Sequence, residues 1–270
     1  ACINTYFCFF DDMRRVESGA ESEPLFVRAN RALKTIGFQA WTQPYRNDAT
    51  DENVVSAERF RKHVWWVGGN ALTYRAAFQA SVMMNSIPMM DVMAEVAKGA
   101  LSPVSQTTWD EAFWTEGFTA DGAGWGHGRQ CLIWGYPVHG ADSALWILDS
   151  LNDSPWAQSL SRLNVEALMN FVRGSSWHYF NGFVPPCFGR ANMVYGGLAP
   201  ETIPSLNLVE RMLANRGDSF SSAERDELRA FISEARYNQI RMPGYPYGDY
   251  TGSRYFYNND NLMVKNEDFY

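Results

Sequence analysis

The pattern of apolar and polar positions predicts helices over much of the chain. In residues 158–173 the apolar side chains recur every three to four positions, which is the spacing of one helix face. Ser221 with Glu224, and Thr108 with Glu111, match the S/T-x-x-E capping box that opens a helix. The apolar positions after the first of these boxes share one helical face: Leu228, Phe231, Ile232 and Ala235.

Similar patterns extend the prediction to the middle of the chain. Residues 71–84 and 89–98 form a predicted helix pair, broken by Asn85-Ser86-Ile87-Pro88, and residues 139–151 form another predicted helix. Short connections between such segments favour antiparallel neighbours. We therefore expect a mainly α fold of antiparallel helix pairs.

The pattern changes after Pro243. The chain is then dense in Tyr, Gly and Asn and has no helical period, which is typical of turns and short strands. Because one or two strands are not stable alone, we expect sheet partners earlier in the chain or in a longer protein. We divide the chain into a helical domain, residues 1–242, and a linker with the start of a β-sheet region, residues 243–270.

The composition narrows the class of protein. The 270 residues are 46% hydrophobic and 20% charged, as in globular proteins. A net charge of −7 and a pI near 5.2 argue against nucleic acid as a partner, because a nucleic-acid-binding face is basic. No apolar run reaches the roughly 18 residues of a membrane span. We expect neither nucleic acid nor membrane as a partner.

The cysteines and histidines do not predict a metal site. The four cysteines are scattered and have no C-x-x-C spacing, and the four histidines lack a pattern such as H-E-x-x-H. We therefore expect no metal and no cofactor. A Ca²⁺ ion bound by backbone and carboxylate oxygens would leave no clear sequence mark, so Ca²⁺ stays open.

Aromatic residues are abundant, with 10 Trp, 13 Tyr and 17 Phe. Large rings are mostly buried in protein cores, and that is the simplest interpretation of each one. Several tryptophans, however, stand beside Gly, His and Arg in loop-like sequence. Flat rings next to polar groups also suit sugar rings, which have apolar faces and polar rims.

One glycine-rich segment, residues 116–140, combines polar and aromatic side chains. It contains His127, Arg129 and Tyr136 among glycines that disfavour a regular helix start. A loop and one or two helical turns can bring His127 and Tyr136 into one cleft. The alternative is a structural histidine and a buried tyrosine.

Two other segments have a similar texture. In residues 63–76, Asn70 follows two glycines at a plausible helix start, where it is either a functional amide or an N-cap. In residues 177–197, Arg190 follows a glycine in a loop rich in Pro and Gly, and the alternative there is a solvated surface arginine.

Together these three segments resemble the helical domain of the family 8 polysaccharide lyases, which include the chondroitin AC, hyaluronan and xanthan lyases. V-G-G-N at 67–70 is similar to the family's T-G-A-N-R segment. D-G-A-G-W-G-H at 121–127, followed by W-G-Y-P at 134–137, is similar to its D-G-S-F-x-Q-H and Y-x-G-x-Y-G segments. Gly189-Arg190 matches a later G-R pair. The resemblance covers roughly residues 60–270.

The resemblance implies an incomplete (α/α) toroid of roughly nine or ten helices. It implies cleavage of a uronic-acid-containing polysaccharide by β-elimination, which leaves C4–C5 unsaturated ends. The implied catalytic residues are Asn70, His127, Tyr136 and Arg190. The side chains expected to bind substrate are Trp65, Trp66, Arg75, Trp125, Arg129 and Trp134. The partner is then an anionic polysaccharide, and the location is secreted or periplasmic.

The roles within the implied site follow from the chemistry. Asn70 donates to the uronate carboxylate, and Arg190 favours the phenolate form of Tyr136, whose ordinary pKa is near 10. Tyr136 is then the base that removes the C5 proton and the acid that protonates the leaving oxygen. His127 is the alternative base, and the sequence leaves this choice open.

Two other functions stay open at this point. A glycoside hydrolase on a helical toroid would use paired carboxylates, for which Asp110, Glu111, Glu116 and Asp121 are available. A non-catalytic carbohydrate-binding protein would fit the aromatic content equally well.

Overall fold

The structure is a computed structural model that describes residues 2–42, 71–104, 117–125, 135–178, 205–237 and 251–266. The chain divides into two compact units, one made of Ala1–His63 and Leu72–Val96 and the other of Val64–Ala71 and Ala97–Tyr270. Helices take up 68% of the described residues, and nine of them are α-helices. This confirms the prediction of a mainly α fold.

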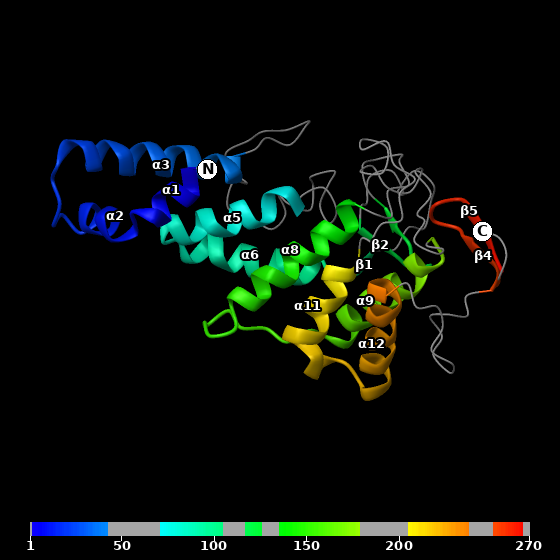
Figure 1. Ribbon diagram of the computed structural model, residues 1–270. Coiled ribbons are helices and arrows are strands. Elements are labelled where there is room, and N and C mark those ends of the chain that lie inside the picture. Colours follow the sequence, from blue (N-terminus) through cyan, green and yellow to red (C-terminus); the bar gives the residue numbers. More distant parts are fainter. Residues whose placement is uncertain are drawn as a thin grey trace. The chain divides into compact units, whose positions relative to one another are not determined.

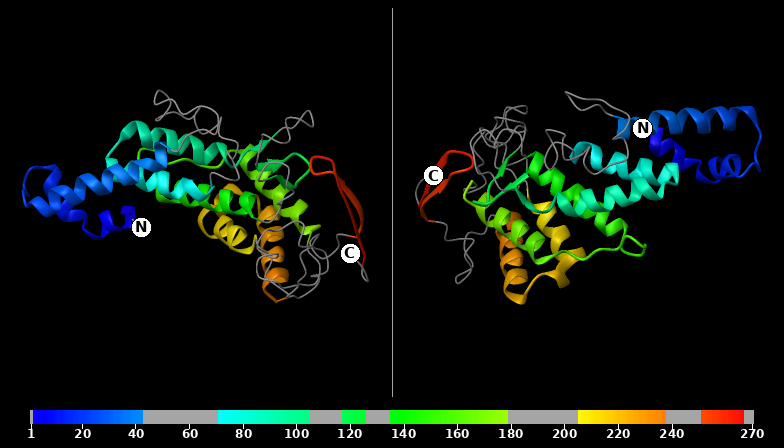
Figure 2. Two further views of the ribbon diagram at one scale, coloured as in Figure 1. Left: turned by 90° about the horizontal axis from the view of Figure 1, so that it is seen from above. Right: turned by 180° about the vertical axis from the view of Figure 1, so that it is seen from behind.

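The regular secondary structure described in the first unit is all α-helical. In it, α3 lies along both α1 and α2 (Figures 1 and 2). Tyr6, Met13 and Trp41 are buried, and the Trp41 indole donates to the Ala77 carbonyl at 2.8 Å, which joins α3 to α5. The helices of this unit are α1 (Cys2–Cys8), α2 (Phe10–Glu17), α3 (Pro24–Thr42), α5 (Ala71–Met84) and most of α6 (Ile87–Gly99).

A cluster of polar side chains joins α1, α2 and α3 around the Glu17 carboxylate. Glu17 accepts hydrogen bonds from the Tyr6 hydroxyl at 2.7 Å and the Asn30 amide at 3.1 Å. It also forms ion pairs with Lys34 at 2.7 Å and Arg14 at 2.9 Å. Burial by itself raises the pKa of Glu17, but hydrogen bonds from Lys34, Tyr6 and Asn30 outweigh it and hold the pKa at about 2. We call these five residues the Glu17 cluster.

The predicted helix pair of residues 71–84 and 89–98 is confirmed as α5 and α6. The break is shorter than predicted, because α6 already begins at Ile87 and includes Pro88. Proline fits the first helical turn, where its missing N–H would have no intrahelical partner. Asn85, with a φ of 52°, ends the preceding turn.

The second unit combines helices with two small sheets. Within it, α11 packs against both α8 and α12, and α9 packs against β1 and β2 (Figure 1). Its helices are α8 (Tyr136–Ser150), α9 (Arg162–Ser176), α11 (Leu206–Arg216), the short 3₁₀ helix η3 (Gly217–Ser219) and α12 (Ser222–Tyr237). Its strands are β1 (Pro103–Val104), β2 (Gly117–Thr119), β3 (Gly124–Trp125), β4 (Gly252–Phe256) and β5 (Asn261–Lys265).

Side-chain caps explain where two of these helices begin. The capping box before α12 is confirmed: the Ser221 N–H donates to Glu224 at 2.8 Å, and the Glu224 N–H donates to the Ser221 hydroxyl at 3.3 Å. The helix predicted from residue 158 begins instead at Arg162. Ser161 and Asn164 form a second box there, with bonds of 3.0 and 3.2 Å. The cap, and not the apolar period, sets that start.

Both sheets are small. The strands run in the order β1-β2-β3, with β1 parallel and β3 antiparallel to β2. Strands of two or three residues are too short to show an alternating pattern, so the sequence did not predict them. The antiparallel β4–β5 hairpin, red in Figure 2, confirms the β material predicted near the C-terminus. Among the described helices, none is both long and apolar enough to cross a bilayer.

Candidate functional site

Most of the predicted site residues lie outside the described residues. This applies to the catalytic candidates Asn70, His127 and Arg190 and to the substrate-binding candidates Trp65, Trp66, Arg129 and Trp134. It also applies to the second predicted capping box, Thr108 with Glu111. Three hydrolase candidates lie outside the described residues as well: Asp110, Glu111 and Glu116. The convergence of these side chains on one site therefore stays a prediction.

Three of the residues predicted for the lyase site have a described backbone position. Trp125 ends β3, and Tyr136 is the first residue of α8, in the second unit. Arg75 is half-buried on α5, in the first unit. The predicted helix at 139–151 is confirmed as α8, although α8 begins three residues earlier and so includes Tyr136.

Residues 117–125 of the glycine-rich segment form a hairpin, β2–turn–β3. Asp121 lies at its tip and is only 7% exposed. One carboxylate oxygen accepts from the Thr119 hydroxyl at 2.5 Å and from the Ala123 N–H at 3.2 Å. Gly122 has a φ of +91°, a conformation that glycine adopts without strain. Asp121 thus closes the turn with its own side chain, as Asx turns do.

Helix α9 supports this turn from one side. The Phe118 and Phe171 rings lie 4.6 Å apart between centroids, and both are buried. The Asn170 amide donates to the Ala120 carbonyl at 2.9 Å. Gly174 faces the Gly122 backbone so closely that a Cβ on Gly174 would overlap the Gly122 carbonyl. The turn therefore rests on a glycine surface of α9 with no room for a side chain.

The β4–β5 hairpin holds the turn through the second Asp121 oxygen and through backbone carbonyls. The Asn258 N–H donates to that carboxylate oxygen at 2.8 Å. The Arg254 guanidinium donates to the Asp121 carbonyl at 2.6 Å, and the Asn259 amide donates to the Gly124 carbonyl at 3.0 Å. We call Arg254, Asn258 and Asn259 the hairpin clasp. Both Asp121 oxygens are therefore already engaged within the fold.

This arrangement changes the expectation for Asp121. If a lyase mechanism holds, the sequence predicts that Asp121→Asn is nearly silent. In the structure the carboxylate accepts three hydrogen bonds from neutral donors, and an amide nitrogen in place of either oxygen would face a donor. The substitution is therefore expected to weaken the fold whichever reaction the protein catalyses.

His178 lies beside the same hairpin and had no predicted role beyond the search for metal ligands. It is fully buried, its Nδ1 lies 3.2 Å from the Gly174 carbonyl, and its ring packs on Phe256 at 4.6 Å between centroids. Burial lowers the pKa of His178 to about 3, so the ring is neutral near pH 7. A neutral, buried imidazole serves packing here.

The first turn of α8 lies against the β2–β3 hairpin. Helix α8 contacts both strands, and Gly124 packs against Pro137, so that a Cβ on Gly124 would lie 2.7 Å from the Pro137 Cγ. Gly124 and Pro137 flank the part of the glycine-rich segment that holds His127 and Tyr136. The two ends of this stretch are therefore side by side.

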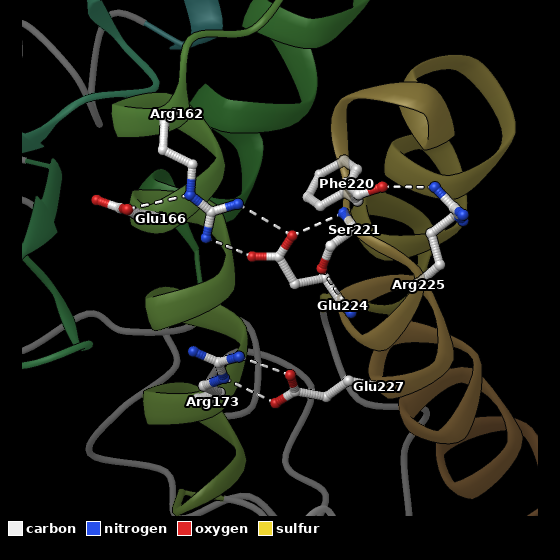
Figure 3. Close-up of polar contacts among 8 residues, drawn as sticks. All are labelled: Arg162, Glu166, Arg173, Phe220, Ser221, Glu224, Arg225 and Glu227. Carbon is white, nitrogen blue, oxygen red and sulfur yellow. Dashed lines mark hydrogen bonds and ion pairs between the residues drawn. The ribbon is translucent and has the colours of Figure 1, made fainter.

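A second polar region lies between α9 and α12 (Figure 3). The Arg162 guanidinium forms two hydrogen bonds with Glu224, at 3.1 and 2.5 Å, and Arg173 forms two with Glu227, at 2.7 and 2.6 Å. Glu166 adds a third carboxylate, 3.0 Å from Arg162. The pairs fasten the two helices together, and the Arg162 pair holds the pKa of Glu224 at about 2.

A surface cavity of about 330 Å³ lies along the face of α9 that carries Arg162 and Arg173, and both arginines line it. Its lining also includes Glu166 and Asn170. Arg162 and Arg173 are each already paired with a glutamate, Glu224 and Glu227, so the positive charges in the lining are compensated. The cavity therefore does not favour an anionic sugar.

The described residues contain no group of three or more His, Cys, Asp or Glu side chains placed to hold a metal ion. The expectation of no metal and no cofactor stays a prediction, because the segments around His63 and His127 are not described. Neither a family model, nor a curated protein, nor a solved structure matches this chain.

Proposed function

We propose that the protein is a polysaccharide lyase that cleaves a uronic-acid-containing polysaccharide by β-elimination. The observation that carries the proposal is the order of Asn70, His127, Tyr136 and Arg190 within glycine-bearing segments that resemble the family 8 lyases. The contact between Gly124 and Pro137 supports it. In the sequence His127 follows Gly124 by three residues and Tyr136 directly precedes Pro137, so the contact joins chain positions close to both proposed residues.

The proposed reaction begins with removal of the C5 proton beside the uronate carboxylate. The electron pair of the C5–H bond stays on the sugar and forms an enediolate with the carboxylate. The C4–O bond then breaks with its electron pair on the leaving oxygen, and a C4–C5 double bond remains. Donors must be aimed at the carboxylate oxygens before the charge develops there. Asn70 supplies an amide for this purpose, with His127 beside it.

Tyr136 takes the C5 proton as a phenolate and returns it to the leaving oxygen, so that no water is consumed. Arg190 supplies the positive charge that favours the phenolate at working pH. His127 is the base instead when the C5 proton faces the other side of the ring, and Tyr136 then acts only as the acid. Correctly matched acid–base catalysis contributes on the order of 10²–10⁴-fold to the rate.

The arrangement of the helices and the cellular location of the protein belong to the same proposal. We propose that the helices form part of an (α/α) toroid, which is supported by the packing of α11 against both α8 and α12. The substrate-binding side chains proposed around the site are Trp65, Trp66, Arg75, Trp125, Arg129 and Trp134. A polymer-degrading enzyme acts outside the cytoplasm, so we propose a secreted or periplasmic location.

The hydrolase alternative is less well supported than it was from the sequence. Asp121 is the one hydrolase candidate among the described residues, and both of its oxygens accept hydrogen bonds from within the fold. A general acid needs a carboxyl group that reaches the glycosidic oxygen. Asp121 therefore suits a structural role.

The test is a panel of hyaluronan, chondroitin, alginate, glucuronan and xanthan, with ultraviolet absorbance of the unsaturated product as the readout. On the best substrate we expect Tyr136→Phe, His127→Ala and Arg190→Ala each to lower turnover by about 10²-fold or more, with the fold intact by circular dichroism. Tyr257→Phe, on the exposed surface of the C-terminal hairpin, is the matched control and is expected to keep normal turnover.

Three outcomes would contradict the proposal. Near-normal turnover in all three site variants would show that the residue assignment is wrong. Cleavage without ultraviolet absorbance would indicate hydrolysis. Equal binding of polymer by the wild type and Tyr136→Phe, with no product from either, would indicate a non-catalytic carbohydrate-binding protein.

A further inference from the structure

The C-terminal hairpin is anchored in the second unit by one face. Phe256 is fully buried and Met263 is 8% exposed, whereas Tyr255 and Leu262, paired on the other face, are 55% and 62% exposed. The buried face packs on His178, and the Arg254 guanidinium lies 4.9 Å from the centre of the Phe256 ring. The hairpin is therefore a docked element and not a free ribbon.

Two of the three hydrogen bonds of the hairpin clasp end on Asp121, in the turn between β2 and β3, and the third ends on Gly124, the first residue of β3. Their acceptors are the Asp121 carboxylate, the Asp121 carbonyl and the Gly124 carbonyl. Asn258 and Asn259 are 4% and 7% exposed, so two of these bonds are shielded from water. The donors and acceptors stand more than 130 residues apart in sequence.

Helix α9 packs closely against the other side of the turn. Gly122 and Gly174 are in close backbone contact, and a Cβ on Gly122 would lie 2.7 Å from the Asn170 carbonyl oxygen. The turn is thus held between α9 and the hairpin clasp. Gly124, whose carbonyl accepts the bond from Asn259, is the first residue of β3. In the sequence His127 follows the end of β3 by two residues.

We propose that the hairpin clasp positions the proposed active site, by fixing the β2–β3 turn from which the segment with His127 departs. This inference rests on the proposed function for its catalytic part. Arg254 and Asn259 are positioning residues in this scheme, because they act on the site through the turn. A shift of about 1 Å in a reacting group can cost on the order of 10²-fold in rate, so a clasp of this kind has a measurable effect.

The experiment compares Asn259→Ala and Arg254→Gln with the matched control Tyr255→Phe. Tyr255 is on the same hairpin and also loses one side-chain hydrogen bond, from its hydroxyl to Asp260 at 2.7 Å, but it faces away from the turn. Hydrogen exchange by mass spectrometry follows the backbone amides of residues 117–125, and kcat and KM are measured on the best polymer of the panel.

We expect exchange in residues 117–125 to rise at least tenfold in Asn259→Ala and Arg254→Gln, and less than twofold in Tyr255→Phe. We expect kcat to fall at least tenfold in the first two variants while KM changes less than threefold. Such a split separates misplaced catalytic groups from general unfolding, and thermal unfolding of each variant confirms that the protein is folded at the assay temperature.

Unchanged exchange in residues 117–125 in both clasp variants would overturn the inference, because the hairpin would then not hold the turn. Faster exchange with normal kcat would also overturn it, because the turn would then not govern the site. A wild type that cleaves no polymer would instead overturn the proposed function. The exchange data would then still decide whether the clasp holds the turn.

Discussion

Each unit contains a carboxylate that accepts hydrogen bonds from several elements, but the burial and the donors differ. Glu17 is partly exposed, whereas Asp121 is buried. In the Glu17 cluster two of the four donors are cations, Lys34 and Arg14. Asp121 accepts from the Thr119 hydroxyl and from the N–H groups of Ala123 and Asn258, all of them neutral. We call these four residues the Asp121 cluster.

The two clusters also differ in their reach along the chain. The Glu17 cluster spans residues 6–34, whereas the bond from Asn258 to Asp121 joins residues 137 positions apart. A cluster with cations responds to pH and salt through Coulomb attraction. A cluster of neutral donors in a buried site responds mainly to the loss of a partner, because a buried donor without an acceptor is costly. We therefore expect the stability of the first unit to depend on pH and salt, and the stability of the second unit to depend on each hydrogen-bond partner of Asp121.

The largest effect is expected from Asp121→Ala. The substitution removes the acceptor of two backbone N–H groups and one hydroxyl, each worth about 1–3 kcal/mol when left buried and unpaired. We expect the free energy of unfolding of the second unit to fall by about 3–5 kcal/mol, measured by urea denaturation.

Asp153→Ala is the control for Asp121→Ala, since Asp153 is an exposed aspartate in the same unit. It is expected to change stability by no more than about 0.5 kcal/mol. Equal effects of the two substitutions would show that the neutral donors do not depend on Asp121.

A smaller effect is expected from acid on the first unit. The pKa of Glu17 is about 2 in the folded protein and 4.5 when unperturbed. A lowered folded-state pKa gives stability that is present above pH 4.5 and is lost as the pH falls from about 4.5 to 2. Allowing for partial exposure of the cluster, we expect this loss to be about 1–2 kcal/mol.

Glu17→Gln tests this assignment, because the amide does not titrate. The difference in unfolding free energy between wild type and variant, measured at several pH values, should shrink as the pH falls through this window. Asp11→Asn, at an exposed carboxylate on α2, should follow the wild type. A constant difference between wild type and Glu17→Gln from pH 7 to pH 3 would contradict the role of Glu17.

The smallest effects come from a matched pair of hydroxyl deletions. Tyr6→Phe removes a 2.7 Å bond to Glu17, and Thr119→Val removes a 2.5 Å bond to Asp121. Glu17 keeps its two cations, so we expect Tyr6→Phe to cost about 0.5 kcal/mol and Thr119→Val about 1 kcal/mol. Calorimetric unfolding of both variants measures the difference, and the reverse order would show that the cations do not compensate.

Local sequence determined the helices, for a physical reason that is visible at their ends. Ser221 and Glu224 satisfy each other's backbone N–H groups within four residues, so the start of α12 was predictable without any knowledge of the fold. The start of α9 was not predicted, although Ser161 and Asn164 form an equivalent box, because Asn in place of Glu or Gln weakens the signal. Mistakes of this kind are local and small.

The candidate site was predictable only in part. The Asp121-Gly122 pair is a turn signal, and a turn is present there. Asn258, Asn259 and Asp260 likewise mark the turn between β4 and β5. Nothing in either segment indicates that the two turns bond to each other, since hydrogen-bond donors of this kind are common on protein surfaces.

The sequence by itself determined that the protein is mainly helical and where several helices lie. Only the tertiary structure decided that Asp121 is a structural carboxylate, that His178 is a neutral core residue and that the hairpin closes on the β2–β3 turn. The physical reason is that caps and apolar periods act over a few residues. The partners of a buried polar group are instead chosen by packing between segments that the chain brings together only on folding.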